Sequence, residues 1–552
     1  MTGTVEDKKV SDVSEVLEKF GKYQKIQYIY ACLPAIFVTM ININYIFIAG
    51  DLEYRAWRPF RCQIPECGNE SAMEPTWWPN NTIDRCKKPV LNYGLLVNDT
   101  CTKSSFTDQL EKCNHWVYES DDTIVAELDL ACQPWKSNLL GTVHNIGMLF
   151  SMIFSGLMSD RFGRKPTLIM CAVGGCVGHL KAFAKSYYAY IAVEIVESAI
   201  SAGTYPAAMV LMIEIGGKHN RILAGVIFSY AVYIGESIFA CIAMVVPYWK
   251  NLVRIIYTPS FFFTLLIFLL KESPRWQVLN GKTDRAKETI IVAAKMNSVP
   301  INLNELYDMD DIKLKEKFKI HSYEKREGFK AIVRSRDIMK RVLVASVCRF
   351  TAVFVYYGLM INSVWLPGNK HTNFLLSTVM SFPGEILALY LMNKIGRKLP
   401  LIVGFLICGF ICGVSAYIPD SYTSTKVIVF LIGKVIISIC FTGAITYSME
   451  LFPTSARGSL LGLCAFASRA GGMLAPLTPM LTTLSPSLPS VFFGCPAIIS
   501  GILLTLTPET KDLPLYDTIE QVQTSVNKKQ SARNVDKGAD NFGFEESTVT
   551  SL

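Results

Sequence analysis

The chain contains too little charge for an ordinary soluble enzyme. Only 18% of its 552 residues are Asp, Glu, Lys or Arg, and 51% are hydrophobic, whereas soluble domains carry about 25% charged residues. The 54 basic and 46 acidic residues lie in a few blocks between long apolar runs, so the net charge of +8 does not indicate a nucleic-acid-binding patch. This distribution is typical of a polytopic membrane protein.

Motifs for catalysis and for metal or nucleotide binding are also missing. The six histidines are scattered, and the sequence has no HExxH, no CxxC and no Gly-rich phosphate loop. An enzyme needs a nucleophile, a base or a metal cluster in a defined arrangement. We therefore expect no enzymatic activity, no ATP-driven pumping, no cofactor and no metal site.

Twelve apolar runs are long enough to cross a bilayer, which requires about 20 residues in a helix. The sequence thus predicts an all-α membrane protein with twelve transmembrane helices. The predicted spans are 26–50, 139–158, 167–186, 188–212, 222–245, 250–270, 342–366, 373–393, 399–418, 425–449, 459–482 and 490–507. The first run follows a charged segment and has no cleavage site after it, so residues 1–25 are expected to form a cytoplasmic N-terminus.

The segment 51–137 is too polar to lie in lipid, and it contains six of the sixteen cysteines. It also contains every N-x-S/T sequon of the chain. The candidate glycosylation sites are Asn69, Asn80 and Asn98, and the candidate disulfide cysteines are Cys62, Cys67, Cys86, Cys101, Cys113 and Cys132. Disulfides and glycans are found outside the cell, so this loop is predicted to be a large glycosylated extracellular loop. Six cysteines allow 15 pairings, and the connectivity stays open.

The remaining polar segments fix the domain order. The linker 271–341 has 17 basic against 11 acidic residues and is predicted to be cytoplasmic. It joins an N-terminal six-helix half, 26–270, to a C-terminal half, 342–507, and a disordered cytoplasmic tail follows over 508–552. The last three residues could bind a scaffold domain that captures C-terminal carboxylates, although so short a pattern favours an ordinary terminus.

Short charged motifs recur at nearly one spacing. Asp160–Lys165 read DRFGRK, and 393–398 read NKIGRK, 233 positions later. Glu214 and Arg221 are seven residues apart, and so are Glu450 and Arg457, 236 positions later. The spacing indicates two parallel six-helix repeats, an arrangement in which the substrate site lies between the halves.

The repeated charges predict a gate at the inner face. Ion pairs between the halves would hold that face closed, and breaking them would open it. The simpler alternative is that they only fix the topology. The candidate gating residues are Asp160, Arg161, Arg164, Glu214, Arg221, Glu450 and Arg457.

These motifs are similar to those of the major facilitator superfamily, and within it to the organic cation, carnitine and anion transporter family. The resemblance is carried by SGLMSDRFGRKP from Ser155, ESPRW from Glu272, ELFPTSARGSLLG from Glu450 and PET from Pro508, together with VAELDLAC ending at Cys132. It covers all twelve spans. It implies an alternating-access transporter of small organic ions in the plasma membrane, with both termini cytoplasmic.

Ionisable residues inside the spans are the first candidates for substrate contacts, because burying them in lipid is costly. Glu236, Glu385 and Arg469 fall nearest mid-span. The resemblance implies that cation carriers hold Asp at the Arg469 position and that anion carriers hold Lys at the Glu385 position. The two reversals together favour a zwitterion or amine of the carnitine, β-alanine or carcinine type.

Two tyrosines are further candidates for substrate contacts, and three alternative interpretations stay open. Tyr356 and Tyr357 match a tyrosine pair that lines the cavity in the family, but adjacent residues on a helix cannot both face inward. Glu385 and Arg469 could instead neutralise each other. The solute could also be an organic anion, and a receptor or scaffold with a ligand-binding outer loop is the alternative from another class. The coupling ion stays open.

Overall fold

The computed structural model describes most of the chain. The described residues are 20–49, 60–64, 67, 77, 86–92, 101–113, 115–118, 120, 122–217, 220–317, 334–419, 421–453, 456–485, 487–511, 520–521 and 524. The predicted glycosylation sites Asn69, Asn80 and Asn98 and the C-terminal Thr550, Ser551 and Leu552 lie outside them.

The first group of helices, called the N-half here, runs from α2 to α12. It consists of α2 (Lys22–Ile43), α3 (Tyr45–Ile48), α5 (Pro134–Phe162), α6 (Arg164–Gly174), η4 (Gly175–Phe183), α7 (Tyr187–Ser201), α8 (Thr204–Gly216), α9 (Arg221–Val245), α10 (Trp249–Tyr257), α11 (Pro259–Phe262), η5 (Phe263–Leu265) and α12 (Leu266–Leu269). Here η marks a 3₁₀ segment. Pro134 begins α5, where its missing N–H costs no hydrogen bond.

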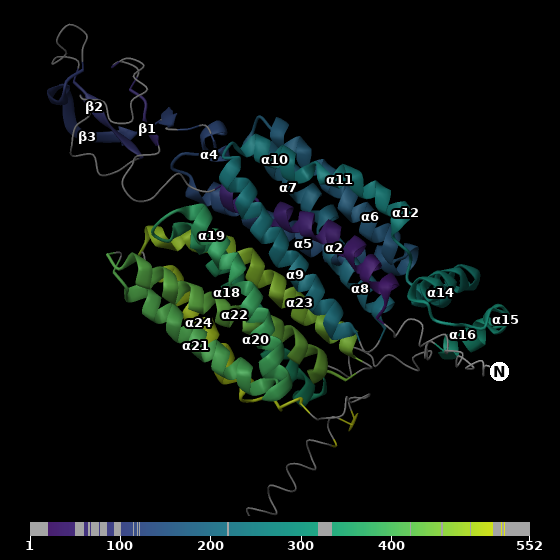
Figure 1. Ribbon diagram of the computed structural model, residues 1–552. Helices are drawn as coiled ribbons and strands as arrows, with labels where there is room; N and C mark the ends of the chain where they lie inside the picture. The colour runs from purple at the N-terminus through teal and green to yellow at the C-terminus, as the bar shows by residue number, and fades with distance from the viewer. Residues whose placement is uncertain are drawn as a thin grey trace, which may run out of the picture.

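The second group, the C-half, lies beside the first (Figure 1). It consists of α18 (Arg336–Asn362), η6 (Ser363–Trp365), α19 (Lys370–Val379), α20 (Ser381–Lys394), α21 (Lys398–Tyr417), α22 (Thr423–Leu451), α23 (Arg457–Leu474), η7 (Ala475–Thr483) and α24 (Leu488–Leu504). The side chain of Asn369 caps α19 by accepting from the backbone N–H of His371 at 2.9 Å.

The helices follow the predicted spans with shifted ends. Among the described residues, ten helical stretches are long and apolar enough to cross a membrane, and Leu488–Leu504 is apolar but shorter. The predicted span 250–270 is divided into the short segments α10, α11, η5 and α12. Several stretches join two segments of different geometry, such as α6 with η4 and α23 with η7. The all-α membrane fold is therefore confirmed.

The loop between α3 and α5 forms a small domain of its own, called the strand domain. Strand β1 (Phe60–Cys62) pairs antiparallel with β4 (Trp116–Tyr118), and β2 (Lys87–Leu91) pairs antiparallel with β3 (Phe106–Lys112). A 3₁₀ turn, η3 (Lys103–Ser105), and a short helix, α4 (Ile124–Glu127), complete its elements. Six short segments of this kind bury little apolar surface, so covalent links carry much of the stability of such a domain.

All six predicted cysteines of the strand domain form disulfides. The pairs are Cys62–Cys113, Cys67–Cys101 and Cys86–Cys132. Cys132 stands two residues before α5, so the third bridge ties the strand domain to the start of the helical bundle. The connectivity that the sequence left open is thereby defined.

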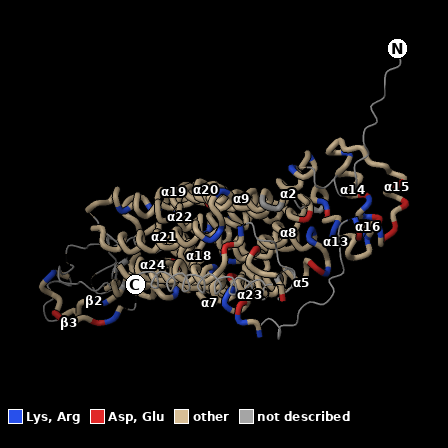
Figure 2. Tube along the Cα trace, turned by 90° about the horizontal axis from the view of Figure 1, so that it is seen from below, with Lys and Arg blue, Asp and Glu red and all other residues tan. Residues whose placement is uncertain are grey.

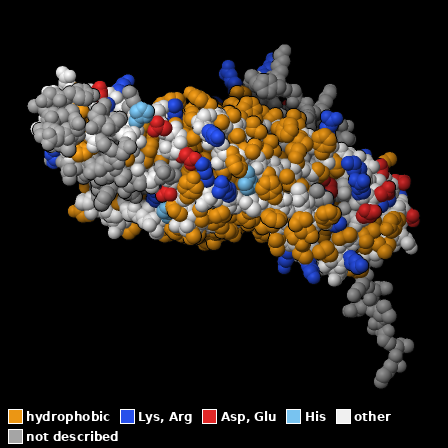
Figure 3. All heavy atoms as spheres, turned by 90° about the horizontal axis from the view of Figure 1, so that it is seen from above, with side chains coloured by type: hydrophobic (Ala, Val, Ile, Leu, Met, Phe, Trp, Pro, Cys, Tyr) orange, Lys and Arg blue, Asp and Glu red, His pale blue; other side chains and the backbone are white. Residues whose placement is uncertain are grey.

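The strand domain and a group of short helices lie at opposite ends of the bundle (Figure 1). The short helices are α13 (Pro274–Leu279), α14 (Thr283–Asn297), α15 (Leu303–Tyr307) and α16 (Asp311–Lys317). Figure 2 shows Lys, Arg, Asp and Glu gathered around these helices and on the strands, while the middle of the bundle has few of them. Hydrophobic side chains cover the middle of the face seen in Figure 3. The pattern matches a bundle that crosses lipid at its middle.

Candidate substrate cavity and its supporting contacts

The first GRK motif forms a tight turn closed by a carboxylate. Gly163 ends α5 with φ of +116° and ψ of 164°, a conformation that is essentially restricted to glycine. The turn places the backbone N–H groups of Arg164 and Lys165 within 3.1 and 3.2 Å of the Glu272 carboxylate. Burial raises the pKa of Glu272, while the hydrogen bonds from backbone N–H groups oppose that rise. The carboxylate thus joins the end of α5 to the segment after α12.

The second GRK motif repeats this arrangement. Gly396 has φ of +132°, and the Glu509 carboxylate accepts from the backbone N–H groups of Arg397 and Lys398, each at 2.9 Å. Burial acts to raise the pKa of Glu509, but the N–H groups, including that of Lys511, outweigh it and lower the pKa below its usual value. We call each arrangement a clasp, and the end of the bundle that holds both is called the motif end.

The arginines of the two motifs pair with the repeated glutamates inside their own halves. Arg164 lies 3.1 Å from Glu214, and Arg397 lies 3.1 Å from Glu450. Arg164 also pairs with the exposed carboxylate of Asp160 at 2.9 Å. These contacts brace each half rather than joining the two halves in this conformation.

The other three predicted gating residues are Arg161, Arg221 and Arg457. The Arg161 guanidinium lies 5.5 Å from the ring centroid of its neighbour Phe162. Arg221 and Arg457 begin α9 and α23, and their side chains lie outside the described part of the structure. The gating role of the whole set stays a prediction.

The two halves contact each other toward the opposite end, which carries the strand domain. The hydroxyl of Thr142 in α5 donates to the carbonyl oxygen of Met473 in α23 at 2.9 Å. The ring of Phe47 in α3 stacks on His371 in α19 with centroids 4.8 Å apart. These contacts close the strand-domain end of the interface.

A cavity of about 180 Å³ lies between the halves, on the motif-end side of these contacts. Its walls come from α5 of the N-half and from α18, α22 and α23 of the C-half. The lining residues are Met152, Arg349, Ala352, Val353, Tyr357, Phe441, Ala444, Ile445, Ala465, Ser468 and Arg469. The cavity is mostly apolar, with two guanidinium groups and two aromatic rings, which is the composition of a small-molecule site.

Among the described residues, no carboxylate neutralises either guanidinium in the cavity wall. Arg349 donates from Nε to the Ser468 hydroxyl at 3.1 Å, and Arg469 approaches the sulfur of Met152 at 3.1 Å. Within the described residues, neither has a carboxylate at ion-pair distance, and no lining residue is acidic. The cavity therefore presents two positive charges with most of their hydrogen-bond donors available.

The structure separates the two predicted tyrosines. Tyr357 lines the cavity, whereas Tyr356 is buried behind it, with its ring 5.5 Å from that of Tyr357. The Tyr356 hydroxyl donates to Glu236 of the N-half at 3.4 Å, and the Lys434 ammonium lies over the Tyr356 ring at 3.2 Å from its centroid. Tyr356 thus stands between a buried acid and a buried base from different halves.

Glu385 is also buried, outside the cavity lining. Its carboxylate accepts from the hydroxyl of Thr442 at 2.5 Å and from that of Tyr233 at 3.2 Å. Tyr233 belongs to the N-half, so this contact also crosses the interface. No ion pair joins Glu385 to Arg469 among the described residues, so their mutual neutralisation is not observed.

Sequence reasoning underrated one residue of the cavity. Arg349 lies near one end of the predicted span 342–366 and is not among the mid-span candidates, yet it lines the cavity with Arg469. The available signal was its alignment along α18 with Tyr357, eight residues away and therefore on a similar helix face. Glu236 and Glu385 show the converse, because burial at mid-span does not distinguish a cavity wall from the packing behind it.

Two pseudo-symmetric helical halves around an interface cavity define a membrane transporter of the major facilitator class. The chain belongs to the family described as "Sugar (and other) transporter", which matches residues 94–521. It is 29% identical to an organic cation transporter protein of Drosophila melanogaster over 96% of this chain and 97% of that protein. It is 27% identical to solute carrier family 22 member 3 of Rattus norvegicus, over 92% and 94% of the two chains.

A solved structure agrees on the fold. The partially occluded inward open conformation of the xylose transporter XylE from E. coli aligns with a TM-score of 0.57 at 15% identity, covering 89% of this chain and all of that one. The predicted superfamily and organic ion transporter family are confirmed, and the chain is a multi-pass transporter of organic ions rather than an enzyme. The receptor hypothesis is not retained.

Proposed function

We propose that the protein carries small organic ions with a carboxylate group, zwitterions of the carnitine or β-alanine type first, across the plasma membrane. One observation carries this proposal: Arg349 and Arg469 line the cavity, and neither has a carboxylate partner in the part of the chain that the structure describes. Uncompensated charge is costly at membrane depth. A solute carboxylate would compensate it and could bind a guanidinium in bidentate fashion.

The rings of the cavity supply a site for the positive end of a zwitterion. Tyr357 and Phe441 both line it, and the faces of aromatic rings attract organic ammonium groups. Buried carboxylates of Glu236 and Glu385 stand behind the walls and add negative potential. The names of the relatives, organic cation transporters, are consistent with a solute that carries a positive group.

An organic anion is the second candidate, because two guanidiniums and no acidic side chain line the cavity within the described residues. The candidates differ in one respect. A zwitterion needs the rings as well as the arginines, whereas a simple anion needs only the arginines. An amine without a carboxylate, such as carcinine, is expected to bind more weakly than either.

The proposed orientation follows from the charge and cysteine distribution. The strand domain, with its three disulfides, would face the outside, and both termini and the motif end would face the cytoplasm. The observed conformation would then be closed to the outside. In the outward-facing conformation, the motif ends of the two halves would approach each other, and the arginines braced by Glu214 and Glu450 would contribute to the inner gate.

Uptake competition tests the substrate class. In cells that express the protein, uptake of labelled β-alanine is measured against a matched zwitterion, amine and acid, with surface abundance followed in parallel. Arg469→Gln should weaken zwitterion recognition by about 2 to 5 kcal/mol, which is roughly 30-fold to several thousand-fold, and should affect the amine much less. Arg254→Gln, an exposed arginine on α10 outside the cavity, is the matched control.

The relative effects on the three solutes distinguish the candidate substrate classes. If the acid competes better than the zwitterion, the protein is an organic anion transporter. If Arg469→Gln weakens all three solutes equally, the arginine acts structurally and the carboxylate assignment is wrong.

A further inference from the structure

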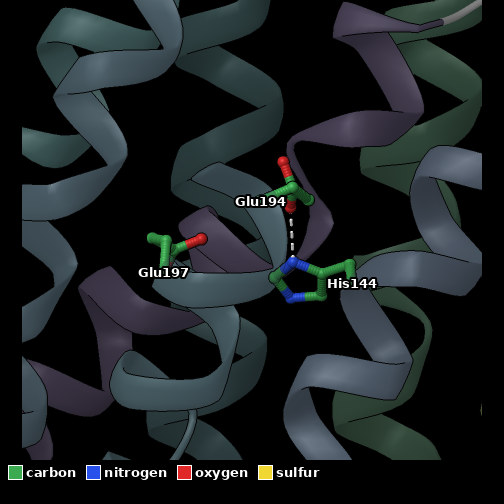
Figure 4. Close-up of side chains that lie close together, drawn as sticks. All are labelled: His144, Glu194 and Glu197. Carbon is green, nitrogen blue, oxygen red and sulfur yellow. Dashed lines mark hydrogen bonds and ion pairs between the residues drawn. The ribbon is translucent and has the colours of Figure 1, made fainter. Parts of the chain in front are cut away.

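A second group of ionisable side chains is buried inside the N-half, away from the cavity. His144 of α5, Lys181 of η4, and Glu194 and Glu197 of α7 are each at most 1% exposed. His144 Nδ1 lies 2.7 Å from Glu194, and Figure 4 shows the imidazole directed at this carboxylate, with Glu197 one turn along the same helix. We call these four residues the His144 cluster.

The cluster has the residue types of a metal site but is already filled by a cation. Its histidine nitrogen and carboxylate oxygens lie within 4.8 Å of one another. The Lys181 ammonium, however, lies 2.8 Å from Glu194 and 2.9 Å from Glu197. It occupies the position between the carboxylates that a metal ion would need, and it has a third partner in the Tyr257 hydroxyl at 2.6 Å.

With both carboxylates ionised, the charges of the cluster balance when His144 carries an extra proton. One ammonium and two carboxylates leave a net charge of −1, and an imidazolium brings the sum to zero. A buried group with net charge is strongly disfavoured in a lipid-embedded bundle. Neutrality therefore favours the protonated form of His144 in this conformation.

The hydrogen bonds of His144 agree with this assignment. Nδ1 faces a carboxylate oxygen, which can only accept, and Nε2 faces Oδ1 of Asn42 at 3.0 Å, which also accepts. An imidazole with two acceptor partners must carry a proton on both nitrogens. The Asn42 side chain also interacts with the hydroxyl of Tyr205.

A turn of the Asn42 amide shows how the site could release its proton. If the Asn42 side chain turned by half a rotation, Nδ2 would donate to Nε2, and His144 would be neutral. The two states of the site thus differ by one proton and one amide orientation. The other described polar groups around the cluster include Tyr45, Tyr190, Ser201, Tyr205 and Tyr257, and none of these supplies a further positive charge.

Helix α5 connects the cluster to the cavity and to the closed interface. Met148 and Met152 lie one and two turns beyond His144 on a similar face, and both sulfurs contact Arg469. Thr142, on the turn of His144, donates across the interface to Met473. A change in how His144 is held would therefore act on the helix that forms both the solute site and the outer closure.

We propose that the His144 cluster binds the coupling ion of this transporter, and that this ion is a proton. The proton is held in the conformation closed at the strand-domain end and is exchanged during the transport cycle. Because the ligand binds one conformation more tightly, acid on the strand-domain side favours closure there. The proton-binding claim stands by itself, whereas its coupling to solute rests on the proposed function.

The protonation state can be measured without any solute. In purified protein with ¹⁵N-labelled histidine, His144 is assigned by the signal lost in His144→Gln, or by elimination with Gln variants of the other five histidines if that variant does not fold. We expect imidazolium shifts at neutral pH for His144, with both nitrogens protonated. A neutral imidazole at all pH values from 5 to 8 would overturn the proposal.

Coupling is measured in proteoliposomes with labelled β-alanine and an internal pH dye. An acid exterior should raise uptake several-fold, and solute entry should acidify the interior. His144→Gln should abolish both effects, as should Asn42→Asp, which keeps two acceptors on His144 and retains the proton. His179→Gln, a histidine of η4 outside the cluster, should leave both effects intact.

The results separate the two proposals. If β-alanine, carnitine and the matched acid are all not transported, the proposed substrate class fails while the histidine signal still tests the proton site. Transport without a response to the pH gradient, or a full response in His144→Gln, would refute coupling through this cluster.

Discussion

Replacing Gly163, the residue that ends α5, by alanine should destabilise the N-half. Gly163 adopts φ of +116° and ψ of 164°, where a non-glycine residue costs about 1 to 3 kcal/mol. A Cβ there would also lie 2.2 Å from Oε2 of Glu272. The carboxylate must therefore move away from the N–H groups of Arg164 and Lys165.

The cost of that movement adds to the backbone strain. A hydrogen bond to a charged group contributes about 1.5 to 3 kcal/mol, and the displaced carboxylate loses at least one. Gly163→Ala should therefore lower the free energy of unfolding by about 2.5 to 6 kcal/mol. Gly396→Ala should cost less, because its Cβ would lie 2.9 Å from the Glu509 carboxylate.

Buried thiols provide the assay. Seven of the ten free cysteines are buried, so a thiol-reactive dye reports thermal unfolding of the purified protein in detergent. The matched control is Gly156→Ala, two turns earlier in α5, where a Cβ meets nothing within 4 Å and alanine should stabilise the helix by up to about 1 kcal/mol. Equal unfolding midpoints for Gly163→Ala and Gly156→Ala would refute the role assigned to the clasp.

Two further outcomes test the inner gate and the sidedness. Asp160→Asn should reduce transport at unchanged surface abundance, because it removes one of the carboxylates on Arg164 and alters the balance between conformations; the second repeat already has Asn393, so Asn393→Ala should have a milder effect. Unchanged uptake for Asp160→Asn would mean that the residue only fixes topology. Glycosidase should shift the mobility of the wild-type protein, and a shift that survives replacement of all three sequon asparagines would contradict the orientation. Those asparagines are Asn69, Asn80 and Asn98.

The fold was predictable because lipid imposes a simple requirement on sequence. A helix must satisfy its own backbone and present about 20 apolar residues, so the spans could be located without knowing their contacts. The prediction failed in detail at 250–270, where Pro259 follows Tyr257 by two residues and the structure has three short helices and a 3₁₀ turn. Hydropathy does not distinguish such a broken crossing from a continuous helix.

The site was harder to predict because burial and access differ. Arg469, Tyr357, Glu236 and Glu385 all lie deep in apolar spans, yet only the first two line the cavity. Helical direction separates Tyr356 from Tyr357, but only the packing of the two halves decides which face borders empty space. The partner of Glu214 shows the same limit. The repeated spacing marked Glu214 as a gating candidate without identifying its partner, and the described contact comes from Arg164, 50 positions earlier.

The two clasps have a mechanical consequence for the transport cycle. Each clasp links the turn between the second and third crossings of its half to the segment after the sixth crossing. Each half therefore resists bending along its length. When two rigid halves share one interface, strain that arises at the interface cannot relax within either half. It leads instead to rotation of the halves about the interface. A half with a broken clasp would bend instead. The free energy of solute binding at one end would then not be converted into movement at the other end.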